Sequence, residues 1–171
     1  MNISQWRISS SVFIFLILLS VFLPVNPANA EPSLNVNVQS AQGVSFELNE
    51  YLGSVVYVDF WASWCGPCRK SFPWMNSMHN KYAAQGLKIV AINLDTDPKL
   101  AKQFLKEIQA SFDIAYDADM QVASEFDIIG MPTSYLFNRK GELVAQHVGF
   151  YREDHMKYEA EIKRWLAMVD D

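Results

Sequence analysis

Residues 55–68 read VVYVDFWASWCGPC, a β-branched and aromatic run that leads directly into two cysteines. A near-continuous apolar run of this length is typical of a strand buried on both faces of a sheet. Cys65 and Cys68 are the only cysteines in the 171-residue chain. Any disulfide within the chain therefore closes a very short loop and stabilises the fold little. The spacing instead favours exchange chemistry, because dithiol and disulfide interconvert readily in Cys-x-x-Cys motifs.

The two cysteines are expected to have different roles. Cys65 falls in the turn after the strand, at the N-terminus of the next helix, where unpaired N–H groups and the helix dipole stabilise a thiolate. We therefore predict that Cys65 is the exposed nucleophile and that Cys68, one turn inside, is the resolving thiol. Gly66 has no side chain to shield either sulfur, and Pro67 is pre-set for the first helical turn.

Asp59 is an acidic residue inside the apolar run, where packing gives no reason for a charge. Burial raises the pKa of a carboxyl group, which would let Asp59 exchange protons with the second thiol near neutral pH. From residue type and position alone, a strand-end Asp that reaches solvent or caps a helix is equally compatible with the sequence.

A second motif, Gly130-Met131-Pro132-Thr133, places a proline at the entry to a predicted strand. Proline has no backbone N–H to donate to a neighbouring strand and is therefore unfavourable inside a sheet. A cis peptide bond would accommodate it. Because few X-Pro bonds are cis, the residues alone favour a trans turn.

Hydrophobic periodicity outside these motifs predicts alternating strands and helices. The expected strands cover residues 34–38, 44–48, 55–61, 87–94, 114–116, 133–137 and 142–148, and the expected helices cover 67–84, 97–110, 120–126 and 152–169. The inward side chains of the second and last helices are predicted to be Leu100, Phe104, Leu105 and Ile108, and Met156, Ile162, Trp165 and Leu166. Pro73 is expected to bend the first helix or remove a hydrogen bond. This order predicts an α/β fold with a mixed sheet and helices on both faces.

The first thirty residues have the features of a secretory signal peptide, with Arg7, an apolar run over 12–23 and Ala28-Asn29-Ala30 before the expected cleavage. The alternative is an uncleaved membrane anchor, although the run is short of the roughly 20 residues that span a bilayer. Residues 31–171 are then expected to form one domain in the periplasm or another extracytoplasmic compartment, where disulfides persist.

The charge of the chain and the positions of its histidines limit the partners and ligands that it is expected to bind. The chain carries 14 basic and 19 acidic side chains, for a net charge of −5, and it has no basic stripe, so nucleic acid is not an expected partner. His79, His147 and His155 are scattered and most readily explained as surface or satisfied histidines. No metal site is predicted, although two thiolates with a histidine could hold copper or zinc. Covalent haem is excluded, because Arg69 stands where the attachment motif needs histidine.

The chain resembles the thioredoxin superfamily from about residue 55 to its C-terminus. The resemblance rests on VDFWASWCGPC at 58–68, GMPT at 130–133, the Gly141 hairpin and Gly149. It implies a thioredoxin-like fold with Asp59 as a buried acid/base beneath the cysteines and Pro132 as a cis-proline beside the disulfide. It also implies that the Met131 backbone pairs with a substrate chain as an added strand. Trp64, Gly66 and Pro67 would complete the substrate-binding surface.

The interval between the motifs resembles that of one branch of the superfamily. Pro132 follows Cys68 by 64 positions (132 − 68), which is longer than in a minimal thioredoxin, and the additional helix and strand lie between residues 97 and 118. With the leader, this insertion resembles the TlpA-like and ResA-like extracytoplasmic proteins. The resemblance implies a monomeric protein-disulfide reductase without a cofactor. A membrane dithiol conduit of the DsbD or CcdA kind would recharge it.

Three positions depart from the related patterns. Ser71 stands where members that serve cytochrome c maturation usually carry Glu, and Asp59 stands where they tend to have a neutral residue. Ala91 stands where many thioredoxins carry Lys near the buried Asp. A cytochrome c maturation reductant therefore remains an alternative, as does a periplasmic disulfide oxidase or isomerase, which only the compartment favours. The Gly-Pro pair between the cysteines resembles the reducing thioredoxins.

Overall fold

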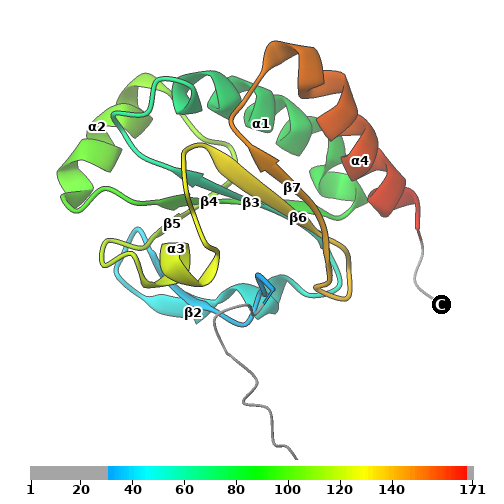
Figure 1. Cartoon of the computed structure of the whole chain (residues 1–171), viewed down its shortest axis with the longest axis horizontal. Helices are drawn as coiled ribbons and strands as arrows, with labels where there is room; N and C mark the ends of the chain where they lie inside the picture. Colours follow the sequence, from blue (N-terminus) through cyan, green and yellow to red (C-terminus); the bar gives the residue numbers. More distant parts are fainter. Residues whose placement is uncertain (1–30, 169–171) are drawn as a thin grey trace, which may run out of the picture.

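A computed structural model describes residues 31–168 as one mixed sheet of seven strands in the order β2-β1-β5-β4-β3-β6-β7 (Figure 1). The predicted signal peptide, residues 1–30, lies outside the described residues. The strands are β1 (Asn37–Ser40), β2 (Ser45–Glu47), β3 (Val55–Trp61), β4 (Leu87–Asn93), β5 (Asp113–Tyr116), β6 (Thr133–Phe137) and β7 (Leu143–Val148). The α-helices are α1 (Cys68–Tyr82), α2 (Pro98–Glu107), α3 (Gln121–Glu125) and α4 (His155–Ala167), and the 3-10 turns are η2 (Leu48–Tyr51), η3 (Ala83–Gln85) and η4 (Arg152–Asp154).

The apolar run around which the sequence is organised forms the central strand, β3. It pairs in parallel with β4 and antiparallel with β6, and all seven of its residues are buried. Its side chains alternate between two apolar clusters. Val55, Tyr57 and Trp61 belong to one cluster, whereas Val56 and Phe60 belong to the other. The prediction of a strand buried on both faces is therefore confirmed.

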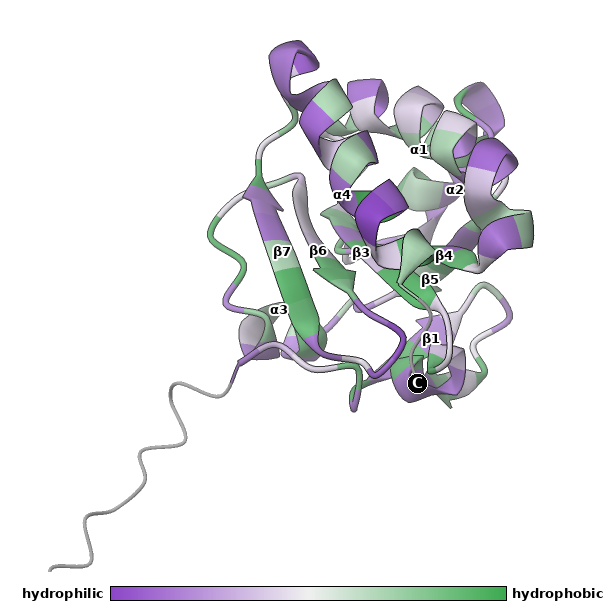
Figure 2. Cartoon of the chain, turned by 90° about the vertical axis from the view of Figure 1, so that its right-hand side faces the viewer, coloured by the Kyte–Doolittle hydropathy of each residue, from purple (hydrophilic) through white to green (hydrophobic). Residues whose placement is uncertain are grey.

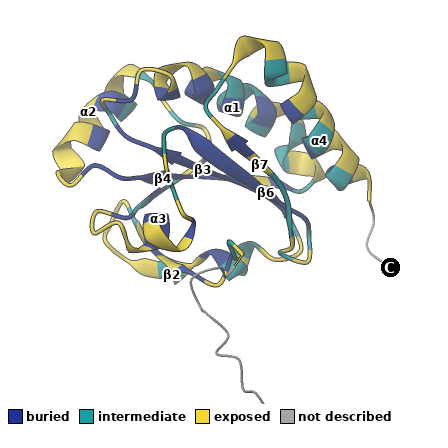
Figure 3. Cartoon of the chain, in the orientation of Figure 1, coloured by how far each residue is buried: buried dark blue, intermediate teal, exposed yellow. Residues whose placement is uncertain are grey.

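Different elements cover the two faces of the sheet. The longer helices α1, α2 and α4 lie on one face, and α3 lies with the N-terminal strands on the other (Figure 1). Seen from the side, the central strands are hydrophobic while the helices carry both hydrophobic and hydrophilic stretches (Figure 2). The same strands are buried along their length, and the helices are buried only on their inner sides (Figure 3). This confirms the α/β mixed sheet with helices on both faces.

The inserted helix and strand predicted before Pro132 correspond to α2 and β5. β5 pairs in parallel with β4 and antiparallel with β1, so the insertion joins the N-terminal hairpin to the rest of the sheet. Asp97 begins α2 as its N-cap, with its Oδ1 accepting from the Lys99 N–H at 3.0 Å. The helix ends at Glu107, three residues before the predicted end at 110.

Two predicted inward side chains are wrong. Leu100 is 45 % exposed, because Ala101 and Phe104 turn the buried stripe of α2 away from it. Met156 is 81 % exposed, because Tyr158 and Ile162 take the inward face of α4. Two residues correspond to about 200° of helix rotation, which carries Met156 to the solvent side.

The first helix, α1, continues from Cys68 to Tyr82 with Pro73 inside it. The proline therefore does not end the helix, although its ring nitrogen has no hydrogen to donate. None of the helices within residues 31–168 has the length and apolar character needed to cross a membrane.

Candidate active site

The two cysteines lie where β3 passes into α1, and they are joined by a disulfide. The Cys65 N–H donates to the Ala62 carbonyl at 3.1 Å, which tightens the turn after the strand. Pro67 already has helical backbone angles (φ −62°, ψ −30°), and Cys68 is the first residue of α1. The Cys68 N–H points at Cys65 Sγ, 3.2 Å away. A free backbone donor at the helix N-terminus thus faces the first sulfur, as the thiolate prediction requires.

In this disulfide form Cys65 is more buried than expected for an exposed nucleophile. Its exposure is 4 %, against 0 % for Cys68. Cys65 is the more exposed of the two cysteines, as predicted. It is nevertheless buried, because both cysteines belong to the apolar cluster that contains Trp61 and Phe72. Solvent instead meets the residues around the disulfide, where Trp64 is 73 % exposed and Gly66 and Pro67 are also exposed.

The second motif reaches the same end of the sheet. The Met131–Pro132 peptide bond is cis, as the thioredoxin resemblance implies and against the expectation from residue frequencies alone. Thr133 pairs with Phe60, so Pro132 comes level with the end of β3 from which the dithiol turn departs. The Pro132 carbonyl accepts from the Gly149 N–H at 2.8 Å. Met131 packs against the apolar cluster that contains both cysteines.

Asp59 lies beneath this site within β3. It is 2 % exposed, and its Oδ2 atom has no hydrogen-bond partner. Because side chains alternate along a strand, Asp59 shares the face of Tyr57 and Trp61 and therefore that of the two cysteines. Burial raises the pKa of the Asp59 carboxyl well above its usual range. Of the two alternatives left open by the sequence, the structure contains the buried carboxyl and not the solvent-facing one.

Ala91 and Ser71, two of the positions that depart from the patterns of related proteins, are both buried near the site. Ala91 lies directly opposite Asp59 on β4 and is fully buried, so no cation approaches the carboxyl from that strand position. Ser71 is buried in the first turn of α1, where its hydroxyl donates to the Cys68 carbonyl at 3.1 Å. The serine thus satisfies the helix backbone and supplies no acid to the site.

One residue beside the site was missed by the sequence reasoning. Asp95 follows the end of β4 and is 3 % exposed. Its carboxylate accepts from the Ser63 N–H and the Ser63 hydroxyl, both at 2.9 Å, and from the Asn93 amide at 2.8 Å. These bonds hold the residue that precedes Trp64 against the neighbouring strand. The signal for Asp95 in the sequence is an acid directly after the apolar run of residues 87–94.

Within residues 31–168, no three or more His, Cys, Asp or Glu side chains are grouped as a metal site would need. His147 is buried, and His79 and His155 lie on α1 and at the start of α4.

Comparison with known proteins places this arrangement in a family. The model of the AhpC/TSA family matches residues 29–146. The chain belongs to this family. It is 32 % identical over 119 residues to the thiol-disulfide oxidoreductase ResA of Bacillus subtilis (strain 168), a match that covers 70 % of this chain and 66 % of that protein. The prediction of a thioredoxin-type, ResA-like protein is confirmed.

Solved structures agree with this assignment. A crystal structure carrying the name thiol:disulfide interchange protein DsbE, from Chlorobium tepidum, is 43 % identical with a TM-score of 0.76 and covers 80 % of this chain and 96 % of that one. StoA from Bacillus subtilis is 26 % identical with a TM-score of 0.62, covering 75 % and 99 %. Together with the Cys65–Cys68 pair, these relatives identify a redox-active thiol-disulfide oxidoreductase that acts on protein thiols.

Proposed function

We propose that this protein is an extracytoplasmic reductant of protein disulfides that uses Cys65 as nucleophile, Cys68 as resolving thiol and Asp59 as acid/base. The observation that carries the proposal is the burial of Asp59 on the same face of β3 as both cysteines, with Cys65 the more exposed of the two residues. The predicted leader over residues 1–30 and the ResA and DsbE relatives support a location outside the cytoplasm, and in a Gram-negative cell that location is the periplasm.

The proposed reaction starts from the dithiol form. The Cys65 thiolate attacks one sulfur of the target disulfide, the target disulfide breaks, and a mixed disulfide forms while the other target sulfur leaves as a thiolate. Asp59, as carboxylate, takes the proton of the Cys68 thiol. The Cys68 thiolate then attacks Cys65 Sγ and releases the second target sulfur. The target gains two electrons and, with protonation of its thiolates, two protons, while the protein ends as the Cys65–Cys68 disulfide.

Substrate docking is proposed on the exposed surface around the disulfide. Trp64, Gly66 and Pro67 supply this surface, and the Met131 backbone beside Pro132 pairs with the substrate chain. We further propose that the protein acts as a monomer, since one chain supplies both cysteines, the acid and the cis-proline. A reductant in an oxidising compartment needs a source of electrons, and a membrane dithiol conduit of the DsbD or CcdA kind would provide it.

Trapping with Cys68→Ser tests the proposal. This variant stalls at the mixed disulfide through Cys65, so mass spectrometry of the captured proteins identifies both targets and electron donor. The matched control is Cys65→Ser, which should capture far less. Capture of apocytochrome c alone would assign the maturation role in spite of Ser71. Equal capture by both variants, or none by either, contradicts the assigned roles of the cysteines.

The direction of electron flow is tested by the reduction potential. The Gly-Pro dipeptide between the cysteines is typical of reducing thioredoxins, whose potential is about −270 mV, against about −120 mV for the oxidant DsbA. Equilibration of the purified protein with glutathione redox buffers measures it. A value above roughly −180 mV, that of the isomerase, would favour the oxidase or isomerase alternative.

A further inference from the structure

A row of polar side chains crosses the sheet on the face that α4 covers. Asp59 on β3 lies directly opposite Ser134 on β6, and Ser134 lies directly opposite His147 on β7. Facing residues of neighbouring antiparallel strands have Cβ atoms about 4.5–5.5 Å apart. The row therefore begins at the buried acid of the site and runs toward the edge of the sheet.

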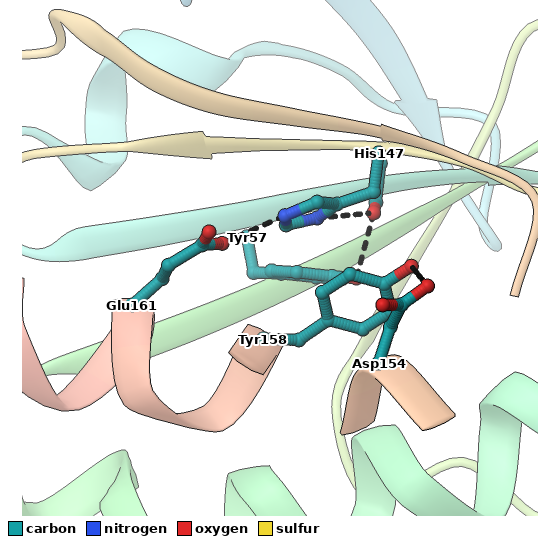
Figure 4. Close-up of polar contacts among 6 residues, drawn as sticks. Tyr57, His147, Asp154, Tyr158 and Glu161 are labelled. Atoms are coloured by element: carbon teal, nitrogen blue, oxygen red, sulfur yellow. Dashed lines mark hydrogen bonds and ion pairs between the residues drawn. The ribbon is translucent and has the colours of Figure 1, made fainter. Parts of the chain in front are cut away.

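Contacts extend this row to the surface of the molecule. The Tyr57 hydroxyl donates to Ser134 Oγ at 2.7 Å, and Ser134 Oγ lies 3.5 Å from His147 Nδ1. His147 Nε2 lies 2.7 Å from Glu161 Oε2 on α4. Figure 4 shows this line of contacts from Tyr57 through the His147 ring to Glu161. Only the last member reaches water, since the Glu161 side chain is 27 % exposed and that of His147 is 6 % exposed.

Asp59 needs such a connection if it has the role proposed above. Its side chain is buried, and its Oδ2 atom has no partner. Yet an acid/base must take up and release one proton in every catalytic cycle. No cation lies at the opposite position on β4, because Ala91 occupies it. Within residues 31–168, the contacts from Ser134 through His147 to Glu161 lead from the position opposite Asp59 toward solvent.

We propose that Ser134, His147 and Glu161 form a proton-transfer line that connects Asp59 to solvent and positions its proton exchange. The proposal rests on the proposed acid/base role of Asp59. The three residues act through Asp59 and do not touch the substrate, so they are positioning residues.

The transfer balances when the imidazole changes tautomer. In the disulfide form Asp59 Oδ2 has no hydrogen-bond partner, so the transfer begins when the carboxyl turns toward Ser134, the residue directly opposite it on β6. The Asp59 proton then passes to Ser134 Oγ, while the hydroxyl proton of Ser134 passes to His147 Nδ1. The Nε2 proton of His147 moves to the Glu161 carboxylate, which releases it to water. Ser134 is unchanged, His147 changes from its Nε2–H to its Nδ1–H form, and Asp59 has lost one proton. Return of His147 to the first tautomer resets the line.

The surroundings of His147 support the neutral form that this transfer needs. Burial lowers its pKa, and Lys157 of α4 acts in the same direction, whereas Glu161 of α4 and Asp154 of η4 oppose them. On its other sides, the ring packs against Tyr158 at a tilt, with centroids 4.1 Å apart, and faces Ser134. Neutral imidazole has one donor and one acceptor nitrogen, as relay requires.

Tyr57 closes the inner end of the line. Burial, followed by the charge of Asp59, raises the pKa of the Tyr57 phenol well above its usual range. Tyr57 therefore stays protonated and fixes Ser134 Oγ as an acceptor, which leaves the hydroxyl proton of Ser134 free to point at His147.

Single-turnover kinetics with a chromogenic aromatic disulfide test the proposal. The reduced protein releases one coloured thiol when Cys65 attacks and a second when Cys68 resolves the mixed disulfide. We expect His147→Gln and Ser134→Ala to slow the second phase about tenfold or more at pH 7, to raise the pH midpoint of that phase, and to leave the first phase unchanged. Ser134→Thr retains a hydroxyl and should restore the rate.

Tyr135→Phe is the matched control. It removes a buried hydroxyl from the next position of β6, on the other face of the sheet, where Tyr135 donates to the Phe126 carbonyl. If this variant slows the second phase as much as Ser134→Ala does, the effect is structural and the line is refuted. If His147→Gln fails to fold, Glu161→Gln replaces it, because that side chain is partly exposed and keeps its shape.

Asp59→Asn distinguishes a failure of the acid/base role of Asp59 from a failure of the proton-transfer line. If Asp59→Asn leaves the second phase unchanged, the proposed role of Asp59 fails, and the line fails with it. If Asp59→Asn slows that phase while Ser134→Ala, His147→Gln and Glu161→Gln keep the rate and pH midpoint of Tyr135→Phe, the acid/base role stands and only the line is overturned.

Discussion

Asp59 carries the one carboxyl group of β3, whose other six residues are apolar or aromatic. Its pKa in the folded chain is raised by burial, well above the value expected when the chain is unfolded. Between those two pKa values the unfolded chain binds fewer protons than the folded one, so folding stability falls as pH rises through that window. The acid is therefore retained at the expense of stability at neutral and alkaline pH, which fits a residue kept for its chemistry.

Asp59→Asn should accordingly stabilise the fold. An amide cannot ionise, so we expect the variant to be more stable than the parent at pH 8 by about 1–3 kcal/mol, with the difference shrinking as pH falls toward 4. Urea unfolding followed by circular dichroism across this range measures it. Glu125→Gln, at an exposed acid, is the control. A difference in stability that does not change with pH would contradict the assigned titration.

Trp64 is the large side chain that the site exposes most, at 73 %. Trp64→Ala should change folding stability by no more than about 0.5 kcal/mol, because little buried surface is lost. We expect the KM for a protein disulfide to rise several-fold, while the rate with oxidised glutathione, which is too small to cover the ring, stays the same. Met156→Ala, at an exposed apolar residue of α4, is the control. Equal losses on both substrates would argue against docking.

The turn between β3 and α1 is fixed by the neighbouring element β4. Asp95, just after β4, receives three hydrogen bonds, two of them from Ser63. This turn carries Trp64 and Cys65, so the end of β4 helps to fix the position of the proposed nucleophile. Within a parallel pair this is a contact between the carboxyl ends of two adjacent strands, where sites commonly form.

Asp95→Ala should therefore affect both stability and thiol reactivity. It leaves buried donors unsatisfied, and we expect a loss of about 1–3 kcal/mol in the free energy of unfolding. The alkylation rate of Cys65 by iodoacetamide in the reduced protein should change as well. Asp97→Ala is the control, because it removes the cap of α2, worth about 1 kcal/mol, without touching the turn. If the two variants behave alike in both measurements, the hydrogen bonds to Ser63 do not position the site.

At the scale of the whole molecule, the N-terminal segment forms part of one of the two apolar clusters that sandwich the sheet. Leu34, Val36, Val38 and Leu48 belong to the apolar cluster that covers the face of β3 opposite the cysteines. The longer helices cover the other face, so this one is covered by the N-terminal segment together with α3. The segment before β3 therefore completes the fold instead of only leading into it.

Leu48→Ala tests this at a side chain with no exposure. Removal of a fully buried leucine side chain costs about 2–5 kcal/mol, and we expect a single unfolding transition at lower urea concentration. Leu52→Ala, four residues later and 50 % exposed, should cost much less. Equal small effects, or a separate early transition in the Leu48 variant, would show that the segment folds independently of the rest.

The sequence by itself determined the local elements and the chemistry-bearing motifs. Hydrophobic periods of two and of 3.6 residues located β3, the dithiol turn and the strand after Pro132. The family resemblance added the cis bond and the proposed role of Asp59. It did not show which face of α2 or α4 turns inward at Leu100 and Met156, because several stripes fit each pattern.

Only the tertiary structure decided which polar groups meet. Tyr57 and Ser134 are 77 positions apart, and Ser63 and Asp95 are 32 apart, yet each pair shares a hydrogen bond. These contacts follow from the order and register of the strands, which local periodicity does not record. Asp59 could be singled out from its own segment, whereas its position opposite Ser134, and that of Ser134 opposite His147, exist only because β3, β6 and β7 lie side by side.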